Sequence, residues 1–348
     1  MIQPPIEILK SLWSRLPDGR WGVTGLHALE LKPSPGYNSD YFTFEGIVEL
    51  MTTTPSRNIH EVFASFGTTN FLMQQSVLPV VAWKAEDSFI RCIGTASVVS
   101  CSGYLITAAH VLMDPFDSGY GAVREGPQLR LDEALNFGVF IPLSPAYGTR
   151  GIRFFPFEKF WLWGAWKESP LITDKDKFDY LTDIAICKIA EMPHGAAHQP
   201  LGLSLNPFVP GEAAYALGYA EMNDIPLENT NGVAAFDDVA MDLYASIGEA
   251  MEIFPQNHLR KDVPTPGPCF DFKARIPGKM SGAPIFGAGG AVIRGVVSRS
   301  FSGERHAFGA MLGPAMHLPL NDPPNKATLR TLMESGNEGI ARIHGTGL

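Results

Sequence analysis

Hydrophobic and polar residues alternate over residues 270–276, a Phe-Asp-Phe-Lys-Ala-Arg-Ile segment in which every second side chain is apolar. A repeat of two residues is the period of a β-strand that buries one face. The same alternation over residues 152–163, which are rich in Phe and Trp, predicts a strand whose aromatic side chains belong to the core, with an exposed interaction patch as the alternative. The apolar run at residues 104–107 predicts a further, short strand.

A helix is expected near each end of the chain. In residues 5–16, Leu12 and Leu16 follow an earlier apolar residue at intervals of one helical turn, and a Pro-Asp-Gly breaker comes next. This spacing predicts a short amphipathic helix. A second helix is predicted over residues 326–335.

The composition favours a chain made mostly of strands. Its 348 residues include 35 glycines and 28 prolines, and only 18% are charged, which suits many short strands joined by tight turns. Hydrophobic residues make up 45% of the chain, which is enough for a sizeable core. The formal net charge of −9 and the lack of a Lys/Arg run argue against nucleic acid or an anionic membrane as a partner.

Three short motifs carry the candidate chemistry. His110 follows the 104–107 strand in an Ala-Ala-His sequence, Asp183 lies in Thr-Asp-Ile-Ala, and Ser281 lies in Met-Ser-Gly-Ala-Pro. A serine hydroxyl is a poor nucleophile at neutral pH, so a histidine must take its proton, and a carboxylate on the other ring nitrogen fixes the tautomer of that histidine. The motifs therefore predict a catalytic triad in which Ser281 is the nucleophile, His110 the general base and then acid, and Asp183 the orienting carboxylate.

The order His, Asp, Ser resembles that of chymotrypsin-fold (trypsin-like) serine peptidases, and the bacterial trypsin-like peptidases are the most similar type. The resemblance extends over residues 76–320. It includes segments that resemble the family's opening strand, its GTGF-like strand, its ALGYP-like strand and its GIVS strand: residues 76–81, 93–99, 216–219 and 295–298. The resemblance implies an all-β fold of two six-stranded antiparallel β-barrels that hydrolyses peptide bonds, with no cofactor and no metal.

The family usually places glycine two residues before the nucleophile, where the backbone turns an N–H into the oxyanion hole. Here that residue is Lys279, with Gly278 one step earlier. Either the loop is rebuilt around Gly278, or the lysine adopts a conformation that costs about 1–3 kcal/mol. By resemblance, the backbone N–H groups of Lys279 and Ser281 form the oxyanion hole. Met280 stands where trypsin-type zymogens carry an aspartate that receives the freed amino terminus, so that salt bridge is not expected.

The resemblance also assigns residues to substrate binding. Ser298 supports the triad aspartate, and the main chain of Ser298, Arg299 and Ser300 pairs with extended substrate. Arg275 has the sequence offset of the family's specificity residue, and His306 is a candidate wall of the same pocket, where either would select acidic side chains. Strand alternation instead turns Arg275 outward, and the alternative for His306 is an exposed loop histidine without a role.

We expect four segments in the chain. They are an N-terminal extension (1–75), a first barrel with His110 and Asp183 (76–204), a second barrel with Ser281 (205–320), and a C-terminal helix and tail (321–348). Residues 18–75 contain no recognisable motif. The alternatives for them are a packing extension that clasps the barrels and an inhibitory or partner-binding segment.

The four cysteines, Cys92, Cys101, Cys187 and Cys269, lack metal-ligand spacing. Reduced, buried thiols are expected, with a Cys92–Cys101 bridge across a hairpin as the alternative. The first residues lack the basic and apolar regions of a signal peptide, and no uninterrupted apolar stretch is long enough for a transmembrane helix. The chain as given is therefore expected in the cytoplasm.

The sequence thus predicts a serine endopeptidase of bacterial type that cleaves polypeptides through an acyl-enzyme. Two alternatives stay open. One is a pseudoprotease that keeps the barrels as a protein-binding module, and the other is an enzyme that is silent until a partner orders residues 278–281. Lys279 and the unexplained N-terminal extension motivate the first alternative. The N-terminal extension is also a candidate contact for a regulatory protein.

Overall fold

The computed structural model describes most of the chain from residue 73 onward and short strands before it. The described residues are 7–15, 21–29, 32–33, 42–43, 52–53, 73, 75–84, 86–126, 128–142, 152–169, 176–189, 200–220, 224–226, 228–230, 233–236, 243–301, 304–322, 325–335 and 341–345. Strand pairing organises them into two closed barrels of six antiparallel strands each, as the sequence predicted.

The first barrel consists of β6 (Val77–Trp83), β7 (Phe89–Val98), β8 (Tyr104–Thr107), β11 (Asn136–Pro142), β12 (Ile152–Lys167) and β13 (Lys177–Ile189). They pair in the order β11-β6-β7-β8-β13-β12, and the pairing of β11 with β12 closes the barrel. The predicted aromatic strand is β12, where Phe154 and Phe155 are buried and Trp161 and Trp163 pack against the core. Helix α3 (Ala109–Asp117) and a hairpin of β9 (Val123–Glu125) and β10 (Gln128–Arg130) lie between β8 and β11.

The second barrel consists of β15 (Glu212–Tyr219), β19 (Leu243–Phe254), β20 (Cys269–Lys273), β21 (Pro284–Gly287), β22 (Val292–Ser300) and β23 (Ala307–Met311). Their order is β21-β15-β19-β20-β23-β22, closed by β21 with β22. All four apolar positions of the predicted 270–276 strand are buried. The strand itself ends at Lys273, because the Ala274 N–H turns back to the Phe272 carbonyl and the Arg275 carbonyl accepts a hydrogen bond from the Ser246 hydroxyl.

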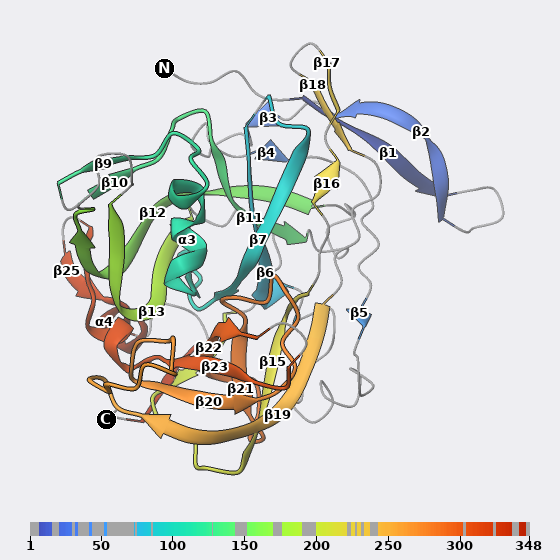
Figure 1. Ribbon diagram of the computed structural model, residues 1–348. Coiled ribbons are helices and arrows are strands. Elements are labelled where there is room, and N and C mark those ends of the chain that lie inside the picture. Colours follow the sequence, from blue (N-terminus) through green and yellow to red (C-terminus); the bar gives the residue numbers. More distant parts are fainter. Residues whose placement is uncertain are drawn as a thin grey trace.

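The two barrels pack through strands whose opposite faces are both apolar. On β6, Leu78 and Val80 face the interior of the first barrel, whereas Val77 and Val81 join a cluster that includes Leu217 of β15. Figure 1 shows the first barrel above the second, whose strands run from yellow to red. Residues from both barrels can therefore meet at the junction.

The N-terminal extension differs from its prediction. The prediction of a helix over residues 5–16 is wrong, because these residues form strand β1 (Glu7–Arg15). Strand β1 pairs with β2 (Trp21–Leu29) and with β18 (Val233–Phe236). Strand β17 (Glu228–Thr230) pairs with the other side of β18. A helix of about a dozen residues is marginal by itself. The backbone of residues 7–15 instead forms ladder hydrogen bonds with two partner strands, one of which is more than two hundred residues away. Strands β3 (Lys32–Pro33) and β4 (Phe42–Thr43) extend the first sheet at β12, and β5 (Thr52–Thr53) pairs with β19.

Shorter elements complete the described chain. They are β14 (Gly202–Ser204), β16 (Ile225–Pro226), the 3-10 helix η2 (Gly313–His317), β24 (Pro319–Asp322), β25 (Asn325–Thr328), α4 (Leu329–Glu334) and β26 (Ile343–His344). The predicted C-terminal helix is α4. It begins after residue 328 because β25 pairs with β24, and the Thr328 hydroxyl caps it by accepting from the Thr331 N–H.

None of the four cysteines belongs to a disulfide, so the alternative bridge between Cys92 and Cys101 does not form. Cys92, Cys187 and Cys269 are buried as expected, whereas Cys101 is exposed. Within the described residues, no helix is both long and apolar enough to cross a membrane.

Candidate active site

His110 lies in the first turn of α3, directly after β8. The residue before the helix, Ala108, is extended and has no side chain that can cap it. The Asp183 carboxylate takes this role, because its Oδ1 accepts the His110 backbone N–H at 3.0 Å. A negative charge at a helix N-terminus is stabilised by the unpaired N–H groups there. The carboxylate thus holds the start of the helix that carries the histidine.

Asp183 also contacts the His110 ring. Its Oδ2 and Oδ1 lie 2.8 and 3.1 Å from Nδ1. The carboxylate belongs to β13 and is 2% exposed, whereas the ring is 18% exposed. Because an ionised carboxylate can only accept, Nδ1 carries the proton and Nε2 is left to act as a base.

The pKa of Asp183 reflects opposing effects. Burial raises it, but the charge of His110 and the hydrogen bonds from the His110 ring, the Ser298 hydroxyl and the His110 backbone outweigh burial. Together they hold the pKa below its ordinary value. Asp183 is therefore ionised at neutral pH.

Ser298 reaches Asp183 from the second barrel. Its hydroxyl donates to Asp183 Oδ2 at 2.5 Å. Ser298 sits at a β-bulge, since Val297 and Arg299 pair with consecutive residues of β23. Bulges re-aim side chains beside functional sites. The sequence expectation that Ser298 supports the aspartate agrees with this hydrogen bond.

A residue that the sequence did not indicate extends this network. The Thr265 hydroxyl, 1% exposed, lies 3.0 Å from the Ser298 hydroxyl. Because Ser298 donates to Asp183, it accepts from Thr265. The Thr265 carbonyl is in turn 3.0 Å from His258 Nε2. Thr265 lies in the connection from β19 to β20, whose sequence has no motif that would have revealed it.

The loop of Ser281 is held against the first barrel. The Thr95 N–H donates to the Ser281 carbonyl at 2.8 Å, and the Gly282 N–H donates to the Val297 carbonyl at 2.8 Å. Gly282 has a φ of +83°, and a Cβ there would lie 2.1 Å from the Thr107 hydroxyl. Only glycine fits this approach. The backbone next to Ser281 is thereby fixed beside the end of β8, just before His110.

The expected strain falls on Lys279. Its φ is +67°, which lies in the left-handed region. Among the residues that the structure describes, Lys279 is the one non-glycine residue with a positive φ. Of the two alternatives, the lysine adopts the turn and Gly278 does not. The conformation costs about 1–3 kcal/mol for a residue with a Cβ. Met280, which follows, is fully buried in the core of the second barrel and anchors the loop there.

The described hydrogen bonds join Asp183 to His110 and to Ser298, but none of them joins the Ser281 hydroxyl to the His110 ring. Hydrogen bonds between nucleophile and base are often long without substrate and tighten when it binds. Ser281 is partly exposed, which the expected role of nucleophile requires.

The candidate specificity residues are not brought to the triad by any described contact. Arg275 is exposed, in agreement with outward alternation. His306 Nε2 lies 3.1 Å from Asp271 Oδ1, and its ring stacks near those of Phe301 and Phe308. Arg299 and Ser300 are exposed at the end of β22. Their substrate contacts stay predictions.

No protein-family model matches the chain, and no curated protein matches it in sequence. Solved structures that are similar include the protease Rv3671c from M. tuberculosis in its active form, with 15% identity and a TM-score of 0.39, covering 82% of this chain and 96% of that one. Another is Deg5, with 17% identity and a TM-score of 0.43, covering 74% of this chain and 90% of that one. The two closed barrels, and not these likenesses, establish the chymotrypsin-like architecture.

Proposed function

We propose that the chain is a serine endopeptidase that hydrolyses peptide bonds of polypeptides through an acyl-enzyme. The observation that carries the proposal is the buried Asp183 carboxylate, which accepts hydrogen bonds from the His110 ring, the His110 backbone and Ser298. Capping the helix requires only the hydrogen bond from the His110 backbone N–H, so the additional contact with the His110 ring points to a role in orienting the imidazole. This arrangement fixes the tautomer in which Nε2 is the base.

The mechanism follows from these atoms. Ser281 Oγ attacks the scissile carbonyl carbon while its proton moves to His110 Nε2. The backbone N–H groups of Lys279 and Ser281 stabilise the negative oxygen of the tetrahedral intermediate. The C–N bond then breaks, and the proton on Nε2 passes to the leaving amine. Water repeats the sequence on the ester, which releases the acid and restores the serine.

Substrate pairing is proposed along the exposed end of β22. The main chain of Ser298, Arg299 and Ser300 would add an extended peptide as a further strand. Such binding would place the scissile carbonyl beside Ser281, because the Ser281 loop is hydrogen-bonded to β22 through Gly282.

A fluorophosphonate probe tests the proposal, because it reacts only with a serine whose base and oxyanion donors are in place. We expect the purified chain to be labelled, and S281A and H110A to lose labelling by about 10³-fold or more. Matched controls are S88A and H344A, which change an exposed serine and an exposed histidine outside the site. Labelling that persists in folded S281A would exclude the proposed nucleophile.

The second candidate is an enzyme gated by a partner. The hydroxyl of Ser281, which no described hydrogen bond joins to His110, favours it. In this case the purified chain stays unlabelled although folded, and labelling appears on addition of the partner. A pseudoprotease stays unlabelled under both conditions.

A further inference from the structure

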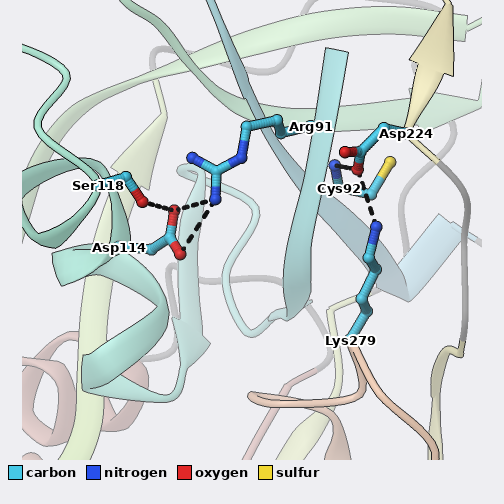
Figure 2. Close-up of polar contacts among 6 residues, drawn as sticks. All are labelled: Arg91, Cys92, Asp114, Ser118, Asp224 and Lys279. Carbon is cyan, nitrogen blue, oxygen red and sulfur yellow. Dashed lines mark hydrogen bonds and ion pairs between the residues drawn. The ribbon is translucent and has the colours of Figure 1, made fainter. Parts of the chain in front are cut away.

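The side chain of Lys279 forms an ion pair across the junction of the barrels. Its Nζ lies 2.8 Å from Asp224 Oδ1, and Figure 2 shows the lysine reaching toward this carboxylate. The side chains are 33% and 42% exposed. The lysine that occupies the left-handed position of the nucleophile loop therefore has a defined partner outside the loop.

Asp224 is fixed to the first barrel. The Cys92 backbone N–H of β7 donates to Asp224 Oδ1 at 3.2 Å. Asp224 directly precedes β16, which pairs antiparallel with β7 through Ile225 and Ile90. The carboxylate is thus held by the Cys92 N–H, and the main chain beside Asp224 is held by strand pairing, so the carboxylate can act as a fixed anchor for Lys279.

The same strand also holds the helix of His110. Arg91, adjacent to Cys92, donates to both oxygens of Asp114 at 3.3 and 3.0 Å. Asp114 lies one turn after His110 in α3, and Figure 2 shows the two contacts on either side of β7. Two consecutive residues of β7 therefore connect the general base and the nucleophile loop.

We propose that Asp224 is a positioning residue that keeps Lys279 in its left-handed conformation and so keeps the Lys279 N–H in the oxyanion hole. The inference rests on the proposed serine-peptidase function. A glycine adopts a positive φ without strain, but a lysine is driven back toward negative φ unless its surroundings oppose this. The Thr95 hydroxyl, 3.4 Å from the Lys279 carbonyl, is a weak restraint, and the ion pair supplies the second one.

We expect the effect of Asp224 to depend on which residue occupies position 279. Asp224 should be required for the left-handed conformation of residue 279 only while that residue is not glycine. A salt bridge that merely stabilised the barrels would act independently of the backbone preference of residue 279. The test is therefore a double-mutant cycle.

The cycle uses D224N, K279G and the double variant K279G/D224N. D224N keeps an oxygen for the Cys92 N–H but removes the charge that holds Lys279, and it conserves volume. We expect D224N to slow fluorophosphonate labelling by about tenfold, which is less than the ~10²–10³-fold value of a whole oxyanion donor because the donor stays in place part of the time. The same change in the K279G background should have no further effect.

The control is D179N, which breaks another Lys–Asp pair, Lys167–Asp179, whose Nζ and Oδ2 lie 2.7 Å apart on the hairpin of β12 and β13. We expect D179N to leave labelling unchanged. Thermal unfolding of each variant shows that the proteins are folded. Labelling of D224N at the wild-type rate would overturn the inference. So would a D224N substitution that slows labelling equally in the wild-type and K279G backgrounds.

A readout without activity separates this inference from the proposed function. Hydrogen exchange in peptides covering residues 277–283 is measured by mass spectrometry in the S281A background. Faster exchange on D224N that disappears with K279G supports the positioning role even if the wild-type chain is never labelled. Unchanged exchange overturns it, whether or not the chain is a peptidase.

Discussion

The two halves of the candidate site are held in different ways. The His110–Asp183 half is buried and has several redundant hydrogen bonds, among them those from the His110 backbone, the His110 ring and Ser298. The nucleophile loop depends on a left-handed lysine, a partly exposed ion pair and a glycine in close contact. The comparison indicates that Asp183 and its partners belong to the buried part of the fold. We expect the loop of Ser281 to be the half whose geometry is disturbed more easily.

The largest effect is expected in the buried half. D183N can donate to Nδ1 or accept from it, so the tautomer of His110 is no longer fixed, and turnover or labelling should fall by about 10⁴-fold. The measurement is the second-order rate of fluorophosphonate labelling at neutral pH. A loss below about tenfold in a folded variant would show that Asp183 only caps the helix.

G282A tests the close contact of the loop. The new Cβ would lie 2.1 Å from the Thr107 hydroxyl and 2.2 Å from the Thr95 carbonyl, at a φ of +83°. We expect a loss of at least about 2 kcal/mol of unfolding free energy and a strong loss of labelling. Denaturant unfolding measures the first. The control is G289A, whose Cβ meets nothing within 4 Å; equal stability of the two variants contradicts the prediction.

S298A tests the network behind Asp183. Its hydroxyl helps to depress the Asp183 pKa. A folded-state pKa below the unfolded value, which is about 3.9, stabilises the protein above that pH, and the contribution is lost as pH falls through the folded pKa.

Removing the Ser298 hydroxyl brings the folded-state pKa of Asp183 closer to its unfolded value. Acid unfolding of S298A should therefore begin at a higher pH than acid unfolding of the wild type. Circular dichroism during acid titration measures the midpoint. T265V, which keeps the Ser298 hydroxyl, should shift it less. A midpoint that does not move would show that Ser298 contributes little to the Asp183 charge.

The smallest effect is expected from salt. The Lys279–Asp224 pair is partly exposed and therefore screened. Raising NaCl from about 0.05 M to about 1 M should slow wild-type labelling by roughly two- to threefold but leave the rate of K279G relatively constant. Equal salt dependence of both proteins would show that salt acts on an interaction other than the Lys279–Asp224 ion pair.

The fold could be predicted from local patterns where a strand buries either one face, as in the alternation over residues 270–276, or both faces, as in the apolar run that became β8. Prediction failed at residues 5–16, where helical spacing is present but pairing with β2 and β18 decides the structure. Strand β18 is more than two hundred residues away in the sequence, so no pattern within residues 5–16 reveals this pairing.

The sequence by itself predicted the candidate chemistry: one histidine, one aspartate and one serine in an order and context that resemble a triad, and a lysine where a turn favours glycine. Tertiary structure alone decided what holds these groups. Asp224 lies 55 residues from Lys279, and Thr265 lies 33 residues from Ser298. The folding of the barrels and their packing against each other bring such pairs together, because hydrogen bonds and ion pairs depend on distance in space and leave no mark in the local pattern.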